Sequence, residues 1–122
     1  MHTIAAVVLG LFLIAAGISH FVFPAYFRSL VPDRLPRPDL LVAGSGILEM
    51  VLGGTVALPA TRAAAGWPVT ALLSVYLLVW VLRLRAAPRR TADRTSLSAT
   101  VAGVVVNAGY VAWAAYVALA VR

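Results

Sequence analysis

Residues 40–58, LLVAGSGILEMVLGGTVAL, form an apolar stretch interrupted by a single charged side chain, Glu49. A helix of this length crosses the ~30 Å hydrocarbon layer of a membrane and satisfies its own backbone hydrogen bonds without water. Glu49 lies near the middle of the stretch, so we expect its carboxyl group near the middle of the bilayer. Placing an acid there costs at least ~2.5 kcal/mol on insertion scales, so we expect the side chain to face other helices or a ligand.

Small and polar residues share one side of this helix with Glu49. Ser45, Gly46 and Gly53 each lie about one turn from Glu49, whereas the other faces are apolar. Two interpretations of Glu49 follow. It forms a proton, ligand or partner site, or it is a neutral side chain whose hydrogen bond to another helix fixes the packing.

The composition of the whole chain also indicates a membrane protein. Of 122 residues, 62% are hydrophobic and 11% are charged, which excludes a soluble domain of ordinary composition. We expect one all-α domain over residues 1–122, a four-transmembrane-helix antiparallel bundle with a Pro-rich interfacial loop between the first and second helices. The predicted helices cover about residues 3–23, 40–58, 63–82 and 97–121.

Four prolines interrupt the segment between the first two predicted helices, PAYFRSLVPDRLPRPD at residues 24–39. Proline lacks a backbone donor and restricts the residue before it, so one long helix is not expected here. We predict a short amphipathic turn and an extended return along the membrane surface. Such a segment is a candidate lid over a site between the helices, formed by Pro24, Phe27, Pro32 and Pro36.

The arginines predict the orientation in the membrane. The chain has a net charge of +6 and no lysine, and its arginines lie between the predicted spans, so we expect no nucleic-acid partner. Eight lie in the loops 24–39 and 83–96, against Arg62 and Arg122 on the other side. Cytoplasmic loops carry the excess of basic residues, so we predict a multi-pass plasma-membrane protein with these two loops in the cytoplasm and both termini outside.

Four further polar side chains in the predicted spans are candidate site residues: His20, Tyr76, Asn107 and Tyr110. Asn107 shares a face with Tyr110 and Gly103, and we expect it to be the hydrogen-bond partner of Glu49. If the first helix ends near residue 23 and the second begins near residue 40, His20 lies ~5 Å and Glu49 ~14 Å from one membrane face at 1.5 Å per residue. A water or polar ligand is therefore expected between these two side chains rather than a direct contact.

Glycines are spaced for close helix packing. Gly10 and Gly17 lie on one face of the first predicted helix, as Gly46 and Gly53 do on the second, and Gly103 of the fourth is a fifth candidate packing residue. Without a Cβ, these faces allow a neighbouring backbone to approach closely, either within the chain or in another subunit.

Trp67 and Trp80, near the two ends of the third predicted helix, are typical of the aromatic belts at membrane interfaces.

An ordered set of residues in the first half resembles the DoxX-like family of small four-helix membrane proteins. The resemblance covers roughly residues 15–54 and is carried by Ala16-Gly17, His20-Phe21, Pro24, Phe27, Val31-Pro32, Leu35-Pro36, Ser45-Gly46, Glu49 and Gly53. It implies a membrane-embedded accessory subunit, as named members are subunits or partners of quinone-linked redox and oxidative-stress systems.

Three classes of function fit these patterns. The resemblance favours an accessory subunit whose buried Glu/His site binds a quinone or a lipid, with no other cofactor expected. The alternatives are a small proton-coupled transporter that uses Glu49, and a structural or assembly protein without small-molecule chemistry. We do not expect a freestanding enzyme, because the sequence has no cysteine, no metal-ligand cluster and no Ser-His-Asp set. Besides the lipid bilayer, we expect a homo-oligomer or a protein partner subunit.

Overall fold

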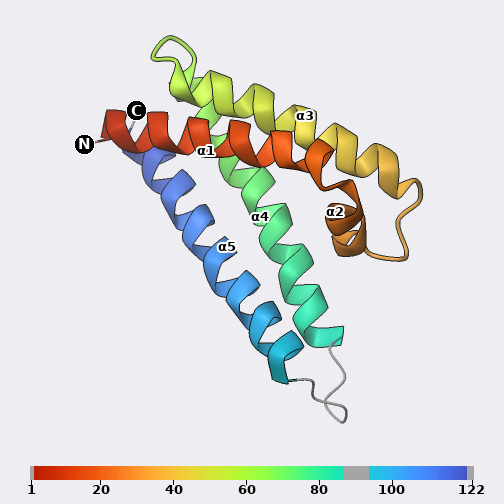
Figure 1. Cartoon of the computed structure of the whole chain (residues 1–122). Helices are drawn as coiled ribbons and strands as arrows, with labels where there is room; N and C mark the ends of the chain where they lie inside the picture. The colour runs from red at the N-terminus through yellow and green to blue at the C-terminus, as the bar shows by residue number, and fades with distance from the viewer. Residues whose placement is uncertain (1, 87–93, 121–122) are drawn as a thin grey trace.

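The computed structural model describes residues 2–86 and 94–120, which form five helices and no strand (Figure 1). Of these helices, four are long and apolar enough to cross a membrane, which confirms the all-α class and the presence of four helices of spanning length. The helices are α1 (His2–Val22), α2 (Pro24–Leu30), α3 (Pro38–Ala57), α4 (Arg62–Ala86) and α5 (Arg94–Ala120).

Three predicted boundaries differ from the structure by two residues or more. α3 begins at Pro38 rather than residue 40, because proline suits the first turn of a helix, where its missing donor is not needed. α4 continues to Ala86, so Arg83 and Arg85 lie on its last turn rather than in a loop, where cations interact favourably with the helix dipole. Within the loop predicted at 83–96, α5 already begins at Arg94. Residues 87–93 and 121 lie outside the described residues.

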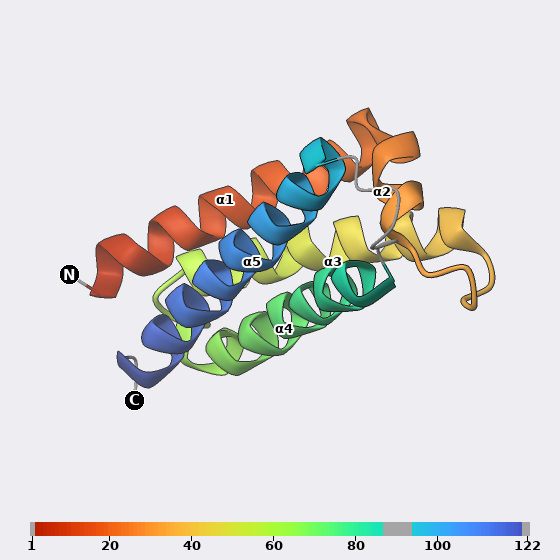
Figure 2. The same cartoon turned by 90° about the horizontal axis from the view of Figure 1, so that it is seen from below.

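The long helices pack as two pairs. α1 lies along α3, and α4 lies along α5. The pairs meet at the end that holds the two chain termini and diverge toward the other end, where α2 lies beside the mouth between them (Figures 1 and 2). This divergence leaves space between the pairs on the α2 side.

Glycines bring α1 and α3 into backbone contact. A Cβ added to Gly10 would lie 2.5 Å from the Gly53 carbonyl oxygen, and one added to Gly17 would lie 2.6 Å from that of Gly46. These four residues are buried inside one chain, so they are not exposed stripes for subunit packing. The fifth predicted packing residue, Gly103 of α5, lies against the Trp80 ring of α4.

The end where the pairs meet contains the apolar core and two hydrogen-bonded anchors. Leu9, Val56, Val69 and Val117, from four different helices, are fully buried there. Buried Arg62 donates from Nε to the Val56 carbonyl at 3.0 Å and from a terminal nitrogen to the Ala57 carbonyl at 2.7 Å, which caps the C-terminus of α3. Trp113 Nε1 donates to the Ala5 carbonyl at 3.1 Å and ties α5 to α1.

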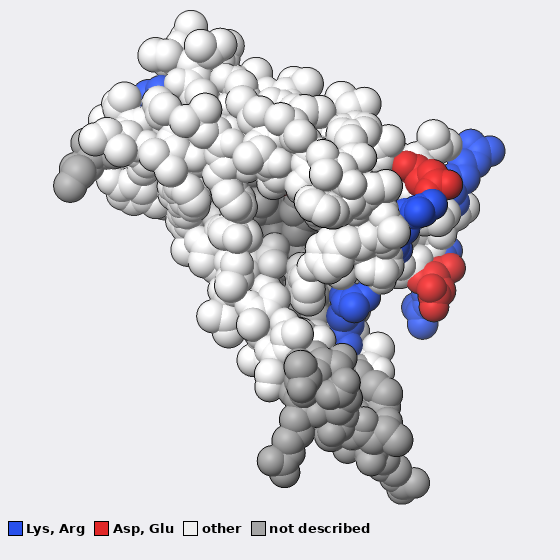
Figure 3. Space-filling view, viewed as in Figure 1, with Lys and Arg blue, Asp and Glu red and all other residues white. Residues whose placement is uncertain are grey.

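Charged side chains gather at the opposite end, around α2. Arg83 of α4 donates to the Ser29 carbonyl of α2 at 2.8 Å, and Arg28 forms an ion pair with Asp39 of α3 at 2.9 Å. Figure 3 shows arginine and acidic side chains beside α2, while most of the remaining face is uncharged. The ends of α2 and α4 therefore lie together with the start of α3.

Candidate functional site

A cavity of about 600 Å³ occupies the space between the two helix pairs. All five helices contribute to its lining, and Figure 3 shows the surface hollowed between α1, α2 and the α4–α5 pair. Most lining side chains are aliphatic or aromatic. Among the lining residues in the described part of the chain, only His20 and Glu49 carry groups that charge near neutral pH. The cavity is therefore apolar, with one polar corner.

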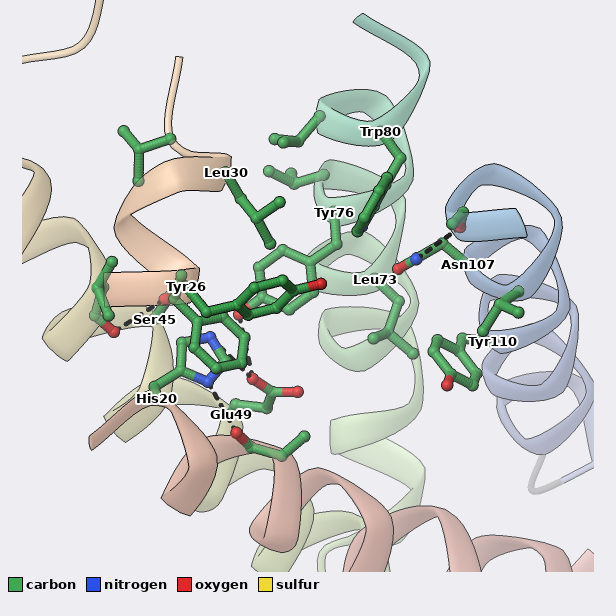
Figure 4. Close-up of a pocket in the computed structure, with 18 of the residues that line it drawn as sticks. His20, Tyr26, Leu30, Ser45, Glu49, Leu73, Tyr76, Trp80, Asn107 and Tyr110 are labelled. Carbon is green, nitrogen blue, oxygen red and sulfur yellow. Dashed lines mark hydrogen bonds and ion pairs between the residues drawn. The ribbon is translucent and has the colours of Figure 1, made fainter. Parts of the chain in front are cut away.

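Glu49 forms the centre of this corner (Figure 4). Its side chain is buried, with 2% of the residue exposed, and it lines the cavity. Tyr76 of α4 donates its hydroxyl to Glu49 Oε2 at 3.2 Å, and His20 Nε2 of α1 lies 3.7 Å from the same oxygen. Three helices thus converge on one carboxyl group.

Two contacts fix the direction in which the His20 ring points. Nδ1 lies 2.7 Å from the Ala16 carbonyl, which only accepts, so Nδ1 carries a proton. The ring also stacks on Phe27 of α2, with centroids 3.8 Å apart and planes tilted by 16°. Nε2 is left facing Glu49.

This orientation requires a proton on the His20–Glu49 pair. A neutral imidazole protonated at Nδ1 presents a lone pair at Nε2, and an ionised carboxylate presents only acceptors. Two acceptors facing each other in a buried site repel, so the pair holds one proton on either the ring or the carboxyl group. At 3.7 Å the two atoms lie next to each other but beyond hydrogen-bond length.

The direct contact between His20 and Glu49 corrects the prediction that water or a ligand separates them. That prediction assumed that the end of the first spanning helix and the start of the second lie at the same depth in the membrane. In the structure, Gly46 of α3 packs against Gly17 and His20 of α1, so α3 extends well past the end of α1. α2 packs against the extension. His20 and Glu49 consequently lie at similar depth.

Asn107 does not pair with Glu49, contrary to the prediction. Its amide donates to the Gly103 carbonyl of its own helix at 2.8 Å. The α3 helix packs more extensively against α4 than against α5, and Tyr76 of α4 reaches Glu49. Tyr110 packs its ring on Phe12, with centroids 4.7 Å apart. Both α5 residues line the cavity on the wall opposite the polar corner.

The remaining predicted site residues are divided between the cavity and its surroundings. Ser45 lines the cavity, and its hydroxyl donates to the Val42 carbonyl at 3.0 Å. Of the predicted lid residues, Phe27 and Pro32 line the cavity. Pro24 begins α2, and Pro36 lies in the non-helical segment before α3, outside the lining.

Sequence reasoning missed part of the aromatic lining. Trp80, interpreted as an interfacial anchor, faces the cavity and packs on Gly103, while Tyr26 and Phe12 complete the aromatic wall. The one-turn spacing of Trp80 from Tyr76 was a signal that both face the same way. Nothing in the sequence indicated the contact with Gly103, because it joins two helices.

The fold and site define an all-helical protein with four potential membrane spans around one buried polar site. Among the described residues there is no cluster of His, Cys, Asp or Glu that could hold a metal. A family model described as a domain of unknown function (DUF8561) matches residues 9–118, and the chain belongs to this family. No curated protein matches the chain, and neither does any solved structure.

Proposed function

We propose that this chain is a DoxX-like accessory membrane protein that binds a quinone ring at the Glu49–His20 pair, as part of a quinone-linked redox or stress-response system. The observation that carries this proposal is a proton-holding pair in the lining of an otherwise apolar cavity. Its volume lies within the range of about 300–1,000 Å³ typical of sites for small organic ligands.

The lining suits a flat ring with two carbonyl oxygens. The proton held by His20 and Glu49 is a hydrogen-bond donor and a quinone carbonyl is an acceptor, while the Tyr76 hydroxyl donates to Glu49 and holds the carboxyl group in place. Phe12, Tyr26 and Trp80 supply aromatic surfaces against which a ring can pack. A lipid carbonyl or phosphate group is also a hydrogen-bond acceptor, but it packs less well than a flat ring against the aromatic side chains.

The residues of this chain perform the proton-handling part of the reaction. Reduction of a bound quinone to the quinol would take up two electrons, supplied by a partner redox subunit, and two protons, passed one after the other through the His20–Glu49 pair. Tyr76 positions the Glu49 carboxyl group through its hydrogen bond. Phe27 keeps the His20 ring directed at Glu49, and the apolar walls exclude water.

Quinone binding to the purified chain in lipid nanodiscs tests this function. Wild type is expected to bind, and His20→Ala to bind roughly 10-fold more weakly, because a charge-assisted hydrogen bond contributes about 1.5–3 kcal/mol. Asp33→Asn is the control, since Asp33 is exposed and does not line the cavity. Equal binding by all three proteins, or binding of phospholipid in place of quinone, would contradict the proposal.

We further propose that the four long helices cross the plasma membrane as an antiparallel bundle, with α2 and residues 31–37 forming the Pro-rich segment at the cytoplasmic surface. Residues 24–39 and 83–96 would then face the cytoplasm, and both termini the outside. The shared location of Arg28 and Arg83 beside α2 supports this orientation, because arginine concentrates on the cytoplasmic side.

Cysteine labelling tests the orientation. The natural chain has no cysteine, so single variants at exposed Asp33 and Ala60 report on opposite ends of the molecule. In intact cells, a membrane-impermeant maleimide is expected to label Ala60→Cys and leave Asp33→Cys unlabelled. Permeabilised cells should label at both positions. Labelling of Asp33→Cys alone in intact cells would mean the opposite orientation.

A small proton-coupled transporter is the second candidate function. It is favoured by the six aromatic residues that line the cavity together with a single carboxylate, since aromatic faces and carboxylates both attract organic cations. In proteoliposomes, this function requires uptake of a lipophilic cation that depends on a pH gradient and on Glu49. Quinone binding without such uptake would favour the accessory role.

A further inference from the structure

The cavity has a lateral opening between α1 and α5. These helices touch where Phe12 meets Tyr110, at 4.7 Å between ring centroids, and where Trp113 reaches Ala5. Toward the start of α5, the wall continues through Val106 and Ala102, both of which line the cavity and are exposed. The hollow in Figure 3 lies on this face of the molecule. We call this gap the α1–α5 opening.

The α1–α5 opening lies at hydrocarbon depth. Val106 belongs to the candidate span Leu97–Ala120, about 14 Å from Leu97 at 1.5 Å per residue. Val106 is 47% exposed, and Ala102 precedes it by one helical turn on the same face. With α5 across the bilayer, only hydrocarbon is in a position to fill such an opening.

The other end of the cavity is covered. Leu30 of α2 and Val31 and Leu35 of the following segment line the cavity on its arginine-rich side. The ion pair of Arg28 with Asp39 and the bond from Arg83 to Ser29 hold these elements in place. A long apolar chain leaving in that direction would have to pass charged groups in water, whereas the α1–α5 opening leads directly to lipid.

On the basis of the proposed quinone site, we infer that the ligand is a membrane-borne quinone with an isoprenoid or alkyl tail, and that the tail leaves through the α1–α5 opening. The ring occupies the polar corner at Glu49, and the tail passes Val106 and Ala102 into the bilayer. Water-soluble quinones without a tail use the ring site alone. The tail therefore adds affinity through contacts that do not involve the proton-holding pair.

Blocking the opening separates tail binding from ring binding. Two quinones with the same ring, one with a tail and one without, are titrated into wild type and variants in nanodiscs of fixed lipid composition. Val106→Trp is expected to weaken the tailed quinone at least 10-fold relative to wild type and to change the tailless quinone less than 3-fold. Ala102→Phe, a second block on the same wall, should show the same pattern if Val106→Trp fails to fold.

Matched controls lie on the outer face of the same helix. Val105 is 66% exposed and Val101 is 43% exposed, and neither lines the cavity. Val105→Trp and Val101→Phe should leave both quinones unaffected. Equal weakening of both quinones by the blocking variants, or no weakening, would overturn the assigned route.

The same titrations test an alternative exit for the tail beside α4, and they test the ring site itself. Val75 of α4 also lines the cavity and is exposed. A tail-specific loss in Val75→Trp, with none in Val106→Trp, would place the exit beside α4 and overturn the α1–α5 route. Failure of wild type to bind either quinone would instead refute the proposed function itself.

Discussion

Glu49→Gln is expected to bind quinone roughly 10- to 100-fold more weakly than the wild-type chain while keeping its fold. The amide has nearly the same shape as the carboxyl group, so it preserves the packing between α3 and α4. It cannot exchange a proton with His20 Nε2, which faces Glu49 at 3.7 Å. A hydrogen bond to a charged group contributes about 1.5–3 kcal/mol, and each 1.4 kcal/mol corresponds to roughly a factor of ten in affinity.

Two further variants test whether the loss of quinone binding is specific to the Glu49 carboxyl group. Tyr76→Phe removes one neutral donor at 3.2 Å from Glu49, so a smaller loss of up to about 10-fold is expected. Asp33→Asn removes an exposed carboxylate that does not line the cavity and should change nothing. If Glu49→Gln binds quinone as wild type does and still co-purifies with its protein partner, the chain has a structural or assembly role and the buried acid serves packing.

Gly53→Ala is expected to lower the free energy of unfolding by about 1–3 kcal/mol, the usual cost of overpacking a tight contact. The added Cβ would lie 2.7 Å from the Gly10 carbonyl oxygen and 2.9 Å from Ile14 Cγ1. The carbonyl belongs to the backbone, so α1 and α3 would have to separate. Reversible unfolding in mixed SDS and detergent micelles measures this change.

Gly54→Ala is the matched control for this prediction. It is the neighbouring residue on the same helix, and a Cβ there meets nothing within 4 Å. Because alanine has a higher helix propensity than glycine by about 1 kcal/mol, this variant should be as stable as wild type or more stable. Equal destabilisation by both substitutions would contradict the prediction, because only the Cβ at Gly53 meets the backbone of α1.

The sequence was sufficient to predict the helices and the burial of Glu49. Apolar stretches of spanning length have few alternatives in a membrane, and an acid within one must avoid lipid. The spacing of Gly10 and Gly17 likewise indicated a face for close packing, although it did not reveal whether α3 or another subunit would occupy that face. The described structure shows α3 there.

The partners of Glu49 could not be predicted fully, because they depend on how the helices are offset and which are neighbours. The offset of α3 past the end of α1 brings His20 to Glu49, and no local pattern encodes it. The two helix pairs diverge, and Asn107 bonds within its own helix. Tyr76 therefore makes the hydrogen bond to Glu49 that we predicted for Asn107. Side-chain periodicity shows which residues share a face of a helix, but it does not show which other helix packs against that face.

The contact between His20 and Glu49 in a lipid bilayer is the most direct test, since both the proton-holding pair and the ring site depend on it. Glu49 is the one glutamate in the sequence, and a His2→Gln variant leaves His20 as the one histidine. With ¹⁵N in histidine and ¹³C in the glutamate carboxyl group, solid-state NMR is expected to show strong dipolar dephasing between Nε2 and the carboxyl carbon, as required for atoms in contact. Absence of dephasing would place the acid away from His20 and contradict the proposed site.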